Sequence, residues 1–181
     1  MTGDRGRRVM VERLQKTASE ICPAHLEQPT LAAVLDYWQQ KRGDRIMPAR
    51  ADINPLELKE HLGWIILVDV LPDFADFRYR LIGTKVSRYF GEESTGRTVS
   101  EAFGRFGPGA VKGVQAIHRK AARDHVPMRA YGGAAWLADG FDYFDALFLP
   151  LSDDGKTANM ILSAFTFDYS AVQAKSQSAL P

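Results

Sequence analysis

The chain has 181 residues, which is enough for one domain with a hydrophobic core and short extensions. Lys and Arg number 23 against 22 Asp and Glu, so the formal net charge is +1 and no excess of positive charge favours nucleic acid as a partner. The single cysteine, Cys22, excludes an intramolecular disulfide, and the longest apolar run is too short to cross a bilayer. With no signal-peptide pattern at the N-terminus, we expect a cytoplasmic protein without membrane insertion.

Helical spacing dominates the first third of the chain. Residues 9–21 form a weakly amphipathic pattern that should end before Pro23, and residues 1–29 are expected to be a helical arm. A stronger helix begins at Thr30, the expected N-cap, and ends at Gly43. Its apolar stripe consists of Leu31, Val34, Leu35 and Trp38. Asn54 has the pattern of an N-cap for a short helix over residues 54–62.

A change from helical to strand spacing follows Gly63. The apolar run 64–71 and the alternating segment 77–82 predict a hairpin. Short helices are expected from Thr84 and from Thr98, whose capping box includes Glu101, and a longer helix runs from Pro108 to about residue 123. Three more strands are predicted over residues 126–137, 141–151 and 158–167, with turns at 139–140 and 153–155. Residues 30–168 should thus form one α+β domain, and residues 169–181 a disordered tail.

The order of these elements and two stretches of sequence resemble the PAS domain family. The segment RLIGTKVSRYFGEESTGRTVSEAF, residues 80–103, is similar to the PAS segment that follows the second strand, with Gly91 and Gly96 at its two glycine positions. The segments YWQQKRGDRIMPARADINP and FRYRLIGT resemble stand-alone, single-domain PAS proteins of alphaproteobacteria. The resemblance implies a PAS fold: a five-stranded antiparallel sheet with helices on one face and N-terminal helices before the first strand. The family's flavin photochemistry uses a cysteine after the second strand, and Cys22 lies outside that region.

A cavity between sheet and helices is where this family usually binds ligands, and alternation suggests which side chains line it. The predicted ligand-binding residues are Tyr79, Leu81, Val114, His118, Tyr131 and Trp136. His118 lies on the helix equivalent to the one from which some PAS domains ligate haem. A histidine at such a position is more often hydrogen-bonded or solvated. No cofactor or metal site is predicted. Arg78 and Arg80 could clamp an anion, although strand parity favours structural pairing with Asp69 or with the N-terminal helix.

The sequence leaves three functions open. The first is a sensor that binds a small metabolite in the PAS cavity and signals through a protein partner or a dimer contact. The second is a ligand-free adaptor that uses the outer sheet face and the N-terminal helices. The third is an enzyme, for which the adjacent pair Asp124 and His125 is the only local acid–base candidate; no catalytic residue is predicted and we do not expect an enzyme. The stripe Leu31, Val34, Leu35 and Trp38 could cover the chain's own sheet or form a homodimer interface.

Overall fold

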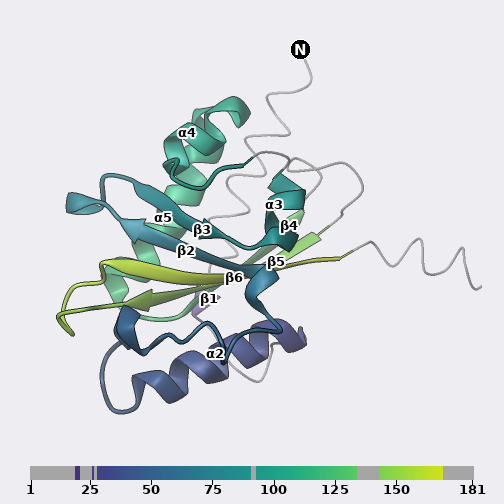
Figure 1. The fold of residues 1–181 in the computed structure, drawn as a ribbon. Helices are drawn as coiled ribbons and strands as arrows, with labels where there is room; N and C mark the ends of the chain where they lie inside the picture. The colour runs from purple at the N-terminus through teal and green to yellow at the C-terminus, as the bar shows by residue number, and fades with distance from the viewer. Residues whose placement is uncertain (1–18, 21–25, 27, 91–92, 134–142, 169–181) are drawn as a thin grey trace, which may run out of the picture.

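A single antiparallel sheet forms the centre of the structure, which is a computed structural model and describes residues 19–20, 26, 28–90, 93–133 and 143–168. The strand order is β1-β4-β5-β6-β2-β3 (Figure 1). The strands are β1 (Ser19–Glu20), β2 (Ile65–Val70), β3 (Phe77–Ile82), β4 (Met128–Gly133), β5 (Tyr143–Leu151) and β6 (Met160–Asp168). The last five form the predicted five-stranded sheet, and the two-residue β1 adds to its edge by pairing with β4.

One face of this sheet, which we call the α2 face, is covered by α2 (Pro29–Arg42). The helix lies across β5 and β6 below the sheet in Figure 1. It begins at Pro29, because the first helical position needs no amide hydrogen, and it ends at Gly43 with a positive φ of 56°. Gln28 is the N-cap, so the prediction of a cap at Thr30 is wrong.

The opposite side, which we call the α5 face, is covered by the helices that connect β3 to β4. These are α3 (Thr84–Phe90), α4 (Val99–Phe103) and α5 (Pro108–Asp124), with the 3₁₀ turn Gly104–Phe106 between the last two. The predicted capping box of α4 is confirmed: the Thr98 hydroxyl accepts from the Glu101 amide, and the Glu101 carboxylate accepts from the Thr98 amide. The axis of α5 crosses β4, β5 and β6, so this helix closes the largest part of the α5 face.

The segment between α2 and β2 differs from the sequence prediction. Residues 55–61 form consecutive turns rather than a short helix, followed by the 3₁₀ turn Leu62–Trp64. The Asn54 side chain still caps the first of these turns by accepting from the Leu56 amide at 3.0 Å. The 3₁₀ turn Arg50–Asp52 also belongs to this segment, whereas the 3₁₀ turn Pro72–Phe74 joins β2 to β3 and contacts α5 through Arg119. The chain here is held by single turns and side-chain contacts instead of a helical ladder.

The alternation of β3 is interrupted by a β-bulge. Leu67 pairs with Leu81 and Val68 pairs with Tyr79, so Arg80 is an extra residue on β3. Because side chains alternate along a strand, the extra residue moves Leu81 to the face opposite Tyr79. Arg80 forms an ion pair with Asp69, with 2.7 Å between Nε and Oδ1, which confirms the structural interpretation of this arginine.

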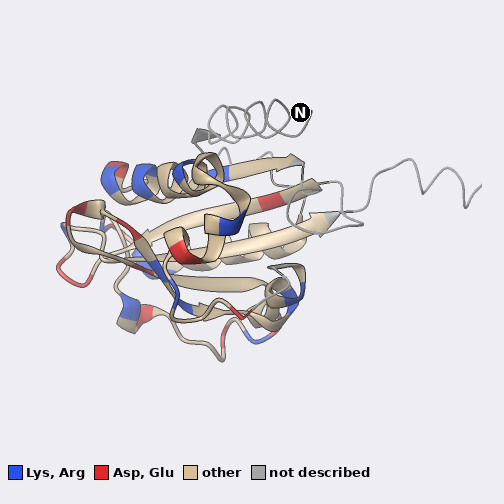
Figure 2. Ribbon diagram, turned by 90° about the horizontal axis from the view of Figure 1, so that it is seen from above, with Lys and Arg blue, Asp and Glu red and all other residues tan. Residues whose placement is uncertain are grey.

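Charges of both signs are dispersed over the helices and loops, and the strands carry few of them (Figure 2). Across the described ranges, no helix has both the length and the apolar character that a membrane span requires. The predicted arm and tail lie mostly outside the described residues, as does the predicted turn at 139–140. Ser19 and Glu20 of the arm belong to a strand rather than a helix.

Candidate functional site

A buried histidine stands at the centre of the α5 face. His118 projects from α5 with 2% of its surface exposed, and its ring packs against Phe77 at 5.1 Å and Phe148 at 5.0 Å between centroids. Its Nδ1 lies 2.8 Å from the Val114 carbonyl, which can only accept, so Nδ1 carries the proton. Burial lowers the pKa of His118 to about 4, against the raising effects of this hydrogen bond and of Asp76. The imidazole is therefore neutral at pH 7.

A serine on the neighbouring strand adds a second polar group to this core. Ser163 lies on β6 directly opposite Phe148 of β5, so its side chain is on the same face as His118. It is fully buried, and its hydroxyl oxygen has no hydrogen-bond partner among the described residues. A buried hydroxyl without a partner costs about 1–3 kcal/mol.

The six predicted ligand-binding residues divide between the two faces. Tyr79 and His118 are buried on the α5 face, and Val114 is half-buried one turn before His118. Burial raises the pKa of the Tyr79 hydroxyl well above its ordinary value. These three residues share the face on which they were predicted to meet.

The other three residues do not join that group. Leu81 is moved to the α2 face by the bulge in β3, and 41% of its surface is exposed. Tyr131 is half-exposed, because the residues of β4 that face α5 are Met128 and Ala130. Trp136 lies outside the described residues. Leu81 and Tyr131 therefore lie on the α2 face, so the six residues do not share one face, and their role in ligand binding stays a prediction.

The predicted interface stripe is buried against the chain's own sheet. Leu31, Val34, Leu35 and Trp38 are each no more than 1% exposed. The Trp38 indole donates a 3.0 Å hydrogen bond to the carbonyl of Pro150, where β5 extends past its partner β4. A dimer contact through these four side chains would require α2 to leave the sheet.

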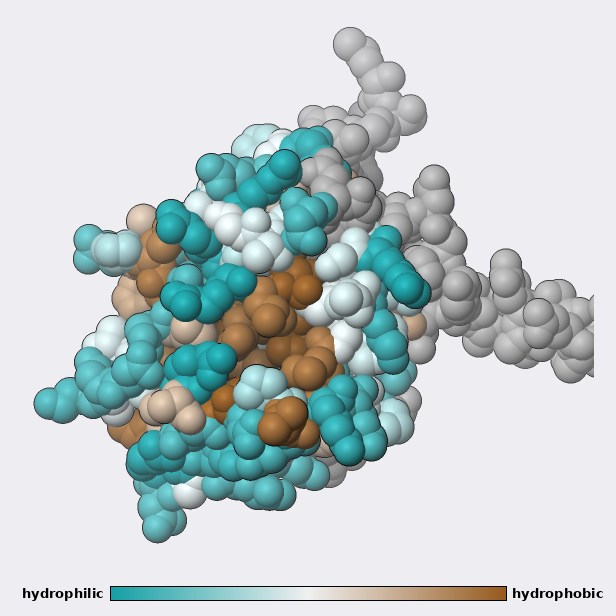
Figure 3. All heavy atoms as spheres, viewed as in Figure 1, coloured by the Kyte–Doolittle hydropathy of each residue, from teal (hydrophilic) through white to brown (hydrophobic). Residues whose placement is uncertain are grey.

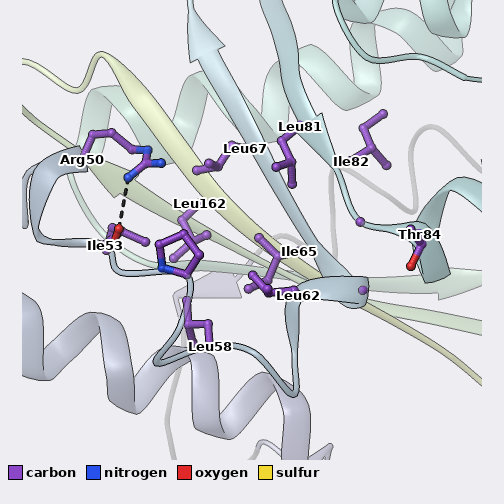
Figure 4. A pocket seen from close by; sticks show the side chains of 13 residues that line it. Arg50, Ile53, Leu58, Leu62, Ile65, Leu67, Leu81, Ile82, Thr84 and Leu162 are labelled. Atoms are coloured by element: carbon purple, nitrogen blue, oxygen red, sulfur yellow. Dashed lines mark hydrogen bonds between the residues drawn. The ribbon is translucent and has the colours of Figure 1, made fainter.

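A pocket of about 310 Å³ opens on the α2 face, which the sequence did not predict. Its floor is formed by Ile65, Leu67 and Leu162, and its wall by Ile53 and Leu58 from the segment after α2 (Figure 4). Figure 3 shows the apolar side chains gathered in a hollow in the middle of this view.

Two glycines allow the closed end of this pocket to form. A Cβ on Gly83 would lie 2.3 Å from the Leu62 carbonyl oxygen, so only glycine lets the two chain segments approach this closely. Gly63 in turn packs against the Lys85 side chain, where a Cβ would lie 2.9 Å from Cγ. The sequence contains both glycines, but no local pattern predicts that the chain around Gly63 and the chain around Gly83 lie against each other.

The part of the chain that the structure describes contains no cluster of possible metal ligands. No three His, Cys, Asp or Glu side chains within those residues are grouped to hold a metal ion. His118, the residue considered for haem, is enclosed between two aromatic rings that would have to separate before an iron could approach its ring.

An antiparallel sheet with α5 on one side and an N-terminal helix on the other defines an α+β domain. The chain belongs to the PAS domain family, because the model of that family matches residues 26–166. It is therefore a sensory or signalling domain in the general sense of that family.

A comparison with curated proteins found no match. Among solved structures, the crystal structure of the IcIR transcriptional regulator from Alicyclobacillus acidocaldarius is similar at 12% sequence identity and a TM-score of 0.30. The similarity covers 93% of this chain and 76% of that chain. A likeness at this TM-score carries no argument about fold or function.

Proposed function

We propose that this PAS domain is a cytoplasmic sensor that binds a small metabolite on the α5 face and signals through a protein partner or a dimer contact. The observation that carries the proposal is the buried Ser163 hydroxyl, which has no partner among the described residues. Apolar ligand sites commonly contain a few polar groups that fix the orientation of the ligand. Ser163, the neutral His118 and the Tyr79 hydroxyl supply this combination on one face.

The position of these groups suggests how binding would be transmitted. His118 lies on α5, whereas Ser163 and Tyr79 lie on the sheet, so a ligand between them would contact both layers. A ligand that favours one packing of α5 on the sheet shifts the population toward that packing and changes the outer surface of the helix. A partner that recognises this surface would then report the ligand.

The test is native mass spectrometry of the purified full chain beside the same sample denatured. We expect an added small-molecule mass that disappears on denaturation. Ser163→Ala should lower the occupancy at least about tenfold, because it removes a hydrogen bond to the ligand. Thr166→Val is the matched control: it lies on the same strand, and its hydroxyl already bonds to the Asp145 carbonyl at 3.4 Å. A bare mass, together with greater stability of Ser163→Ala than of the wild type, would reject the proposal.

A ligand-free adaptor is the second candidate. Tyr131 is 50% exposed and Tyr143 is 57% exposed, and the two side chains flank Asp145 on the α2 face. Exposed aromatic side chains are enriched at protein interfaces. Tyr131→Ser with Tyr143→Ser should then abolish capture of a partner while leaving the fold unchanged; unaltered capture would reject the adaptor.

We also propose that the domain is not an enzyme. His125 ends α5 in a left-handed conformation, with φ of 57°, and the Asp124 carboxylate beside it is paired with Lys120. The acid–base pair considered from sequence therefore lacks the orientation of a histidine by a carboxylate. A turnover activity that is lost in His125→Asn would contradict this proposal.

A further inference from the structure

The pocket on the α2 face has an apolar interior and a partly open mouth. Ile65, Leu67 and Leu162 at its floor are almost completely buried, whereas Leu62 and Leu81 at its rim are 38% and 41% exposed. All lining residues except Arg50 and Thr84 are apolar or glycine. Its volume of about 310 Å³ lies at the small end of the range of about 300–1,000 Å³ in which proteins bind small molecules. The interior therefore suits a short apolar group rather than a large ring system.

One cationic side chain belongs to this lining. Arg50 donates from Nη1 to the Ile53 carbonyl at 3.1 Å, which holds the guanidinium beside the apolar wall (Figure 4). A guanidinium has five N–H donors, so one hydrogen bond leaves most of them available. Among the described residues, no carboxylate forms an ion pair with Arg50.

Two carboxylates lie next to the Arg50 backbone, and neither accepts from its guanidinium. Asp52 accepts from the Ala49 amide at 2.8 Å and forms an ion pair with Arg45 at 2.8 Å. Asp153 accepts from the Arg50 backbone amide and, through its other oxygen, from Asn159. Neither carboxylate forms an ion pair with Arg50 among the described residues, so the guanidinium N–H donors other than the one on Ile53 stay available to a ligand.

We propose that this pocket binds a medium-chain aliphatic monocarboxylate, with the alkyl chain in the apolar interior and the carboxylate on Arg50. The planar fork of a guanidinium matches the two oxygens of a carboxylate, and a charge-assisted pair of this kind is stronger than a neutral hydrogen bond. The alkyl chain would cover the exposed rim side chains Leu62 and Leu81. The site is separate from the α5 face, so the inference does not rest on the ligand proposed there.

Isothermal titration calorimetry of the full chain with octanoate tests the proposal, with 1-octanol as the uncharged comparison. We expect saturable binding of octanoate at one site and binding of 1-octanol at least about tenfold weaker. In two-dimensional amide NMR spectra, octanoate should shift the resonances of Leu81, Ile82 and Gly83. Equal affinity for the two compounds, or shifts confined to the α5 face around Ser163, would overturn the proposal.

Two variants separate the charge from the apolar interior. Arg50→Gln should weaken octanoate binding at least about tenfold and leave 1-octanol binding unchanged. Leu81→Glu, which places a negative charge at the rim, should weaken octanoate binding strongly. The matched controls are Arg78→Gln, an exposed arginine on β3 outside the pocket, and Ile46→Glu, an exposed apolar residue outside it. Affinity unchanged in Arg50→Gln, or lowered equally in Arg78→Gln, would overturn the assignment of the carboxylate to Arg50.

The same titration distinguishes this inference from the proposed function. Ser163→Ala should bind octanoate as the wild type does, because Ser163 lies on the α5 face. Loss of octanoate binding in Ser163→Ala would show that the acid enters the other face, and would overturn the inference while supporting a ligand site there.

Discussion

The two faces of the sheet surround their buried polar groups differently. On the α5 face, His118 and Ser163 are enclosed among aromatic side chains, and the serine hydroxyl has no partner among the described residues. On the α2 face, Trp38 is equally buried, but its indole bonds to the Pro150 carbonyl. Also on the α2 face, Arg50 lines a partly open pocket and forms no ion pair among the described residues.

This difference suggests that the α2 face mainly stabilises the fold, whereas the α5 face responds to pH and to a bound ligand. The part of the α2 face under the helix is an apolar core, in which the buried Nε of Arg42 lies beside Trp38 without a hydrogen-bond partner among the described residues. The free energy needed to open this core should be high because its large side chains are fully buried. The α5 face carries an unsatisfied hydroxyl and a titratable ring inside the core, so its stability should depend on pH and on what it binds. The three predictions below test this contrast from the largest expected effect to the smallest.

Trp38→Ala should have one of the two largest effects on stability. The substitution leaves a cavity under α2 and removes the donor for the Pro150 carbonyl, so the free energy of unfolding should fall by about 3–5 kcal/mol. Urea denaturation followed by circular dichroism measures the loss. Trp38→Phe keeps most of the volume and should cost about 1–2 kcal/mol.

The oligomeric state of these variants gives a second reading of the same helix. Because Trp38 packs on the chain's own sheet, Trp38→Phe should sediment as the wild type does in analytical ultracentrifugation. A small stability loss in Trp38→Ala, combined with conversion of a wild-type dimer to a monomer, would show that the stripe meets a second chain instead.

His118 should make the stability of the domain depend on pH. Its pKa is lowered from 6.5 to about 4 in the fold, mainly by burial, so between these values the unfolded chain binds a proton that the folded chain does not. The free energy of unfolding should therefore fall as the pH drops from about 6.5 to about 4. The expected slope is roughly 1.4 kcal/mol per pH unit, about 3 kcal/mol in total, and this contribution levels off below pH 4.

The pH effect is isolated by comparing variants across the same range. His118→Phe removes the titrating group, so the difference from wild type should grow steadily with falling pH. His125→Asn removes a histidine at the end of α5, where asparagine tolerates the left-handed backbone, and should retain the wild-type slope. Parallel curves for wild type and His118→Phe would show that His118 is not buried as a neutral ring.

The sequence predicted those elements that local patterns specify. The alternation of residues 77–82 marks β3 with its observed bounds, and the capping box at Thr98 is a short-range signal that the structure confirms. The pairing of Arg80 with Asp69 could be inferred from a hairpin alone. In each case the interacting residues lie within a dozen positions of one another.

The candidate site depended on contacts that no local pattern contains. The Trp38 indole meets a carbonyl 112 positions away, so whether α2 covered its own sheet or a second chain stayed undecided in the sequence. The pocket forms because Gly83 admits the Leu62 carbonyl, an approach between two chain segments. Tyr131 was assigned to the wrong face because alternation fixes which residues share a face but not which face it is.

The bulge in β3 predicts the smallest single effect, at Leu81, beside a large effect at Tyr79. Tyr79 and Leu81 would share a face in a regular strand, yet Tyr79 is 2% exposed on the α5 face and Leu81 is 41% exposed on the α2 face. Leu81→Asn should therefore lower the free energy of unfolding by about 1 kcal/mol or less, as expected for a partly exposed position. Tyr79→Asn should cost about 3–5 kcal/mol, because it opens a cavity in a closed core and buries an amide there. Both losses are measured by urea denaturation under the same conditions. Equal losses would mean that the strand alternates without interruption, and the rim of the pocket would then lose Leu81.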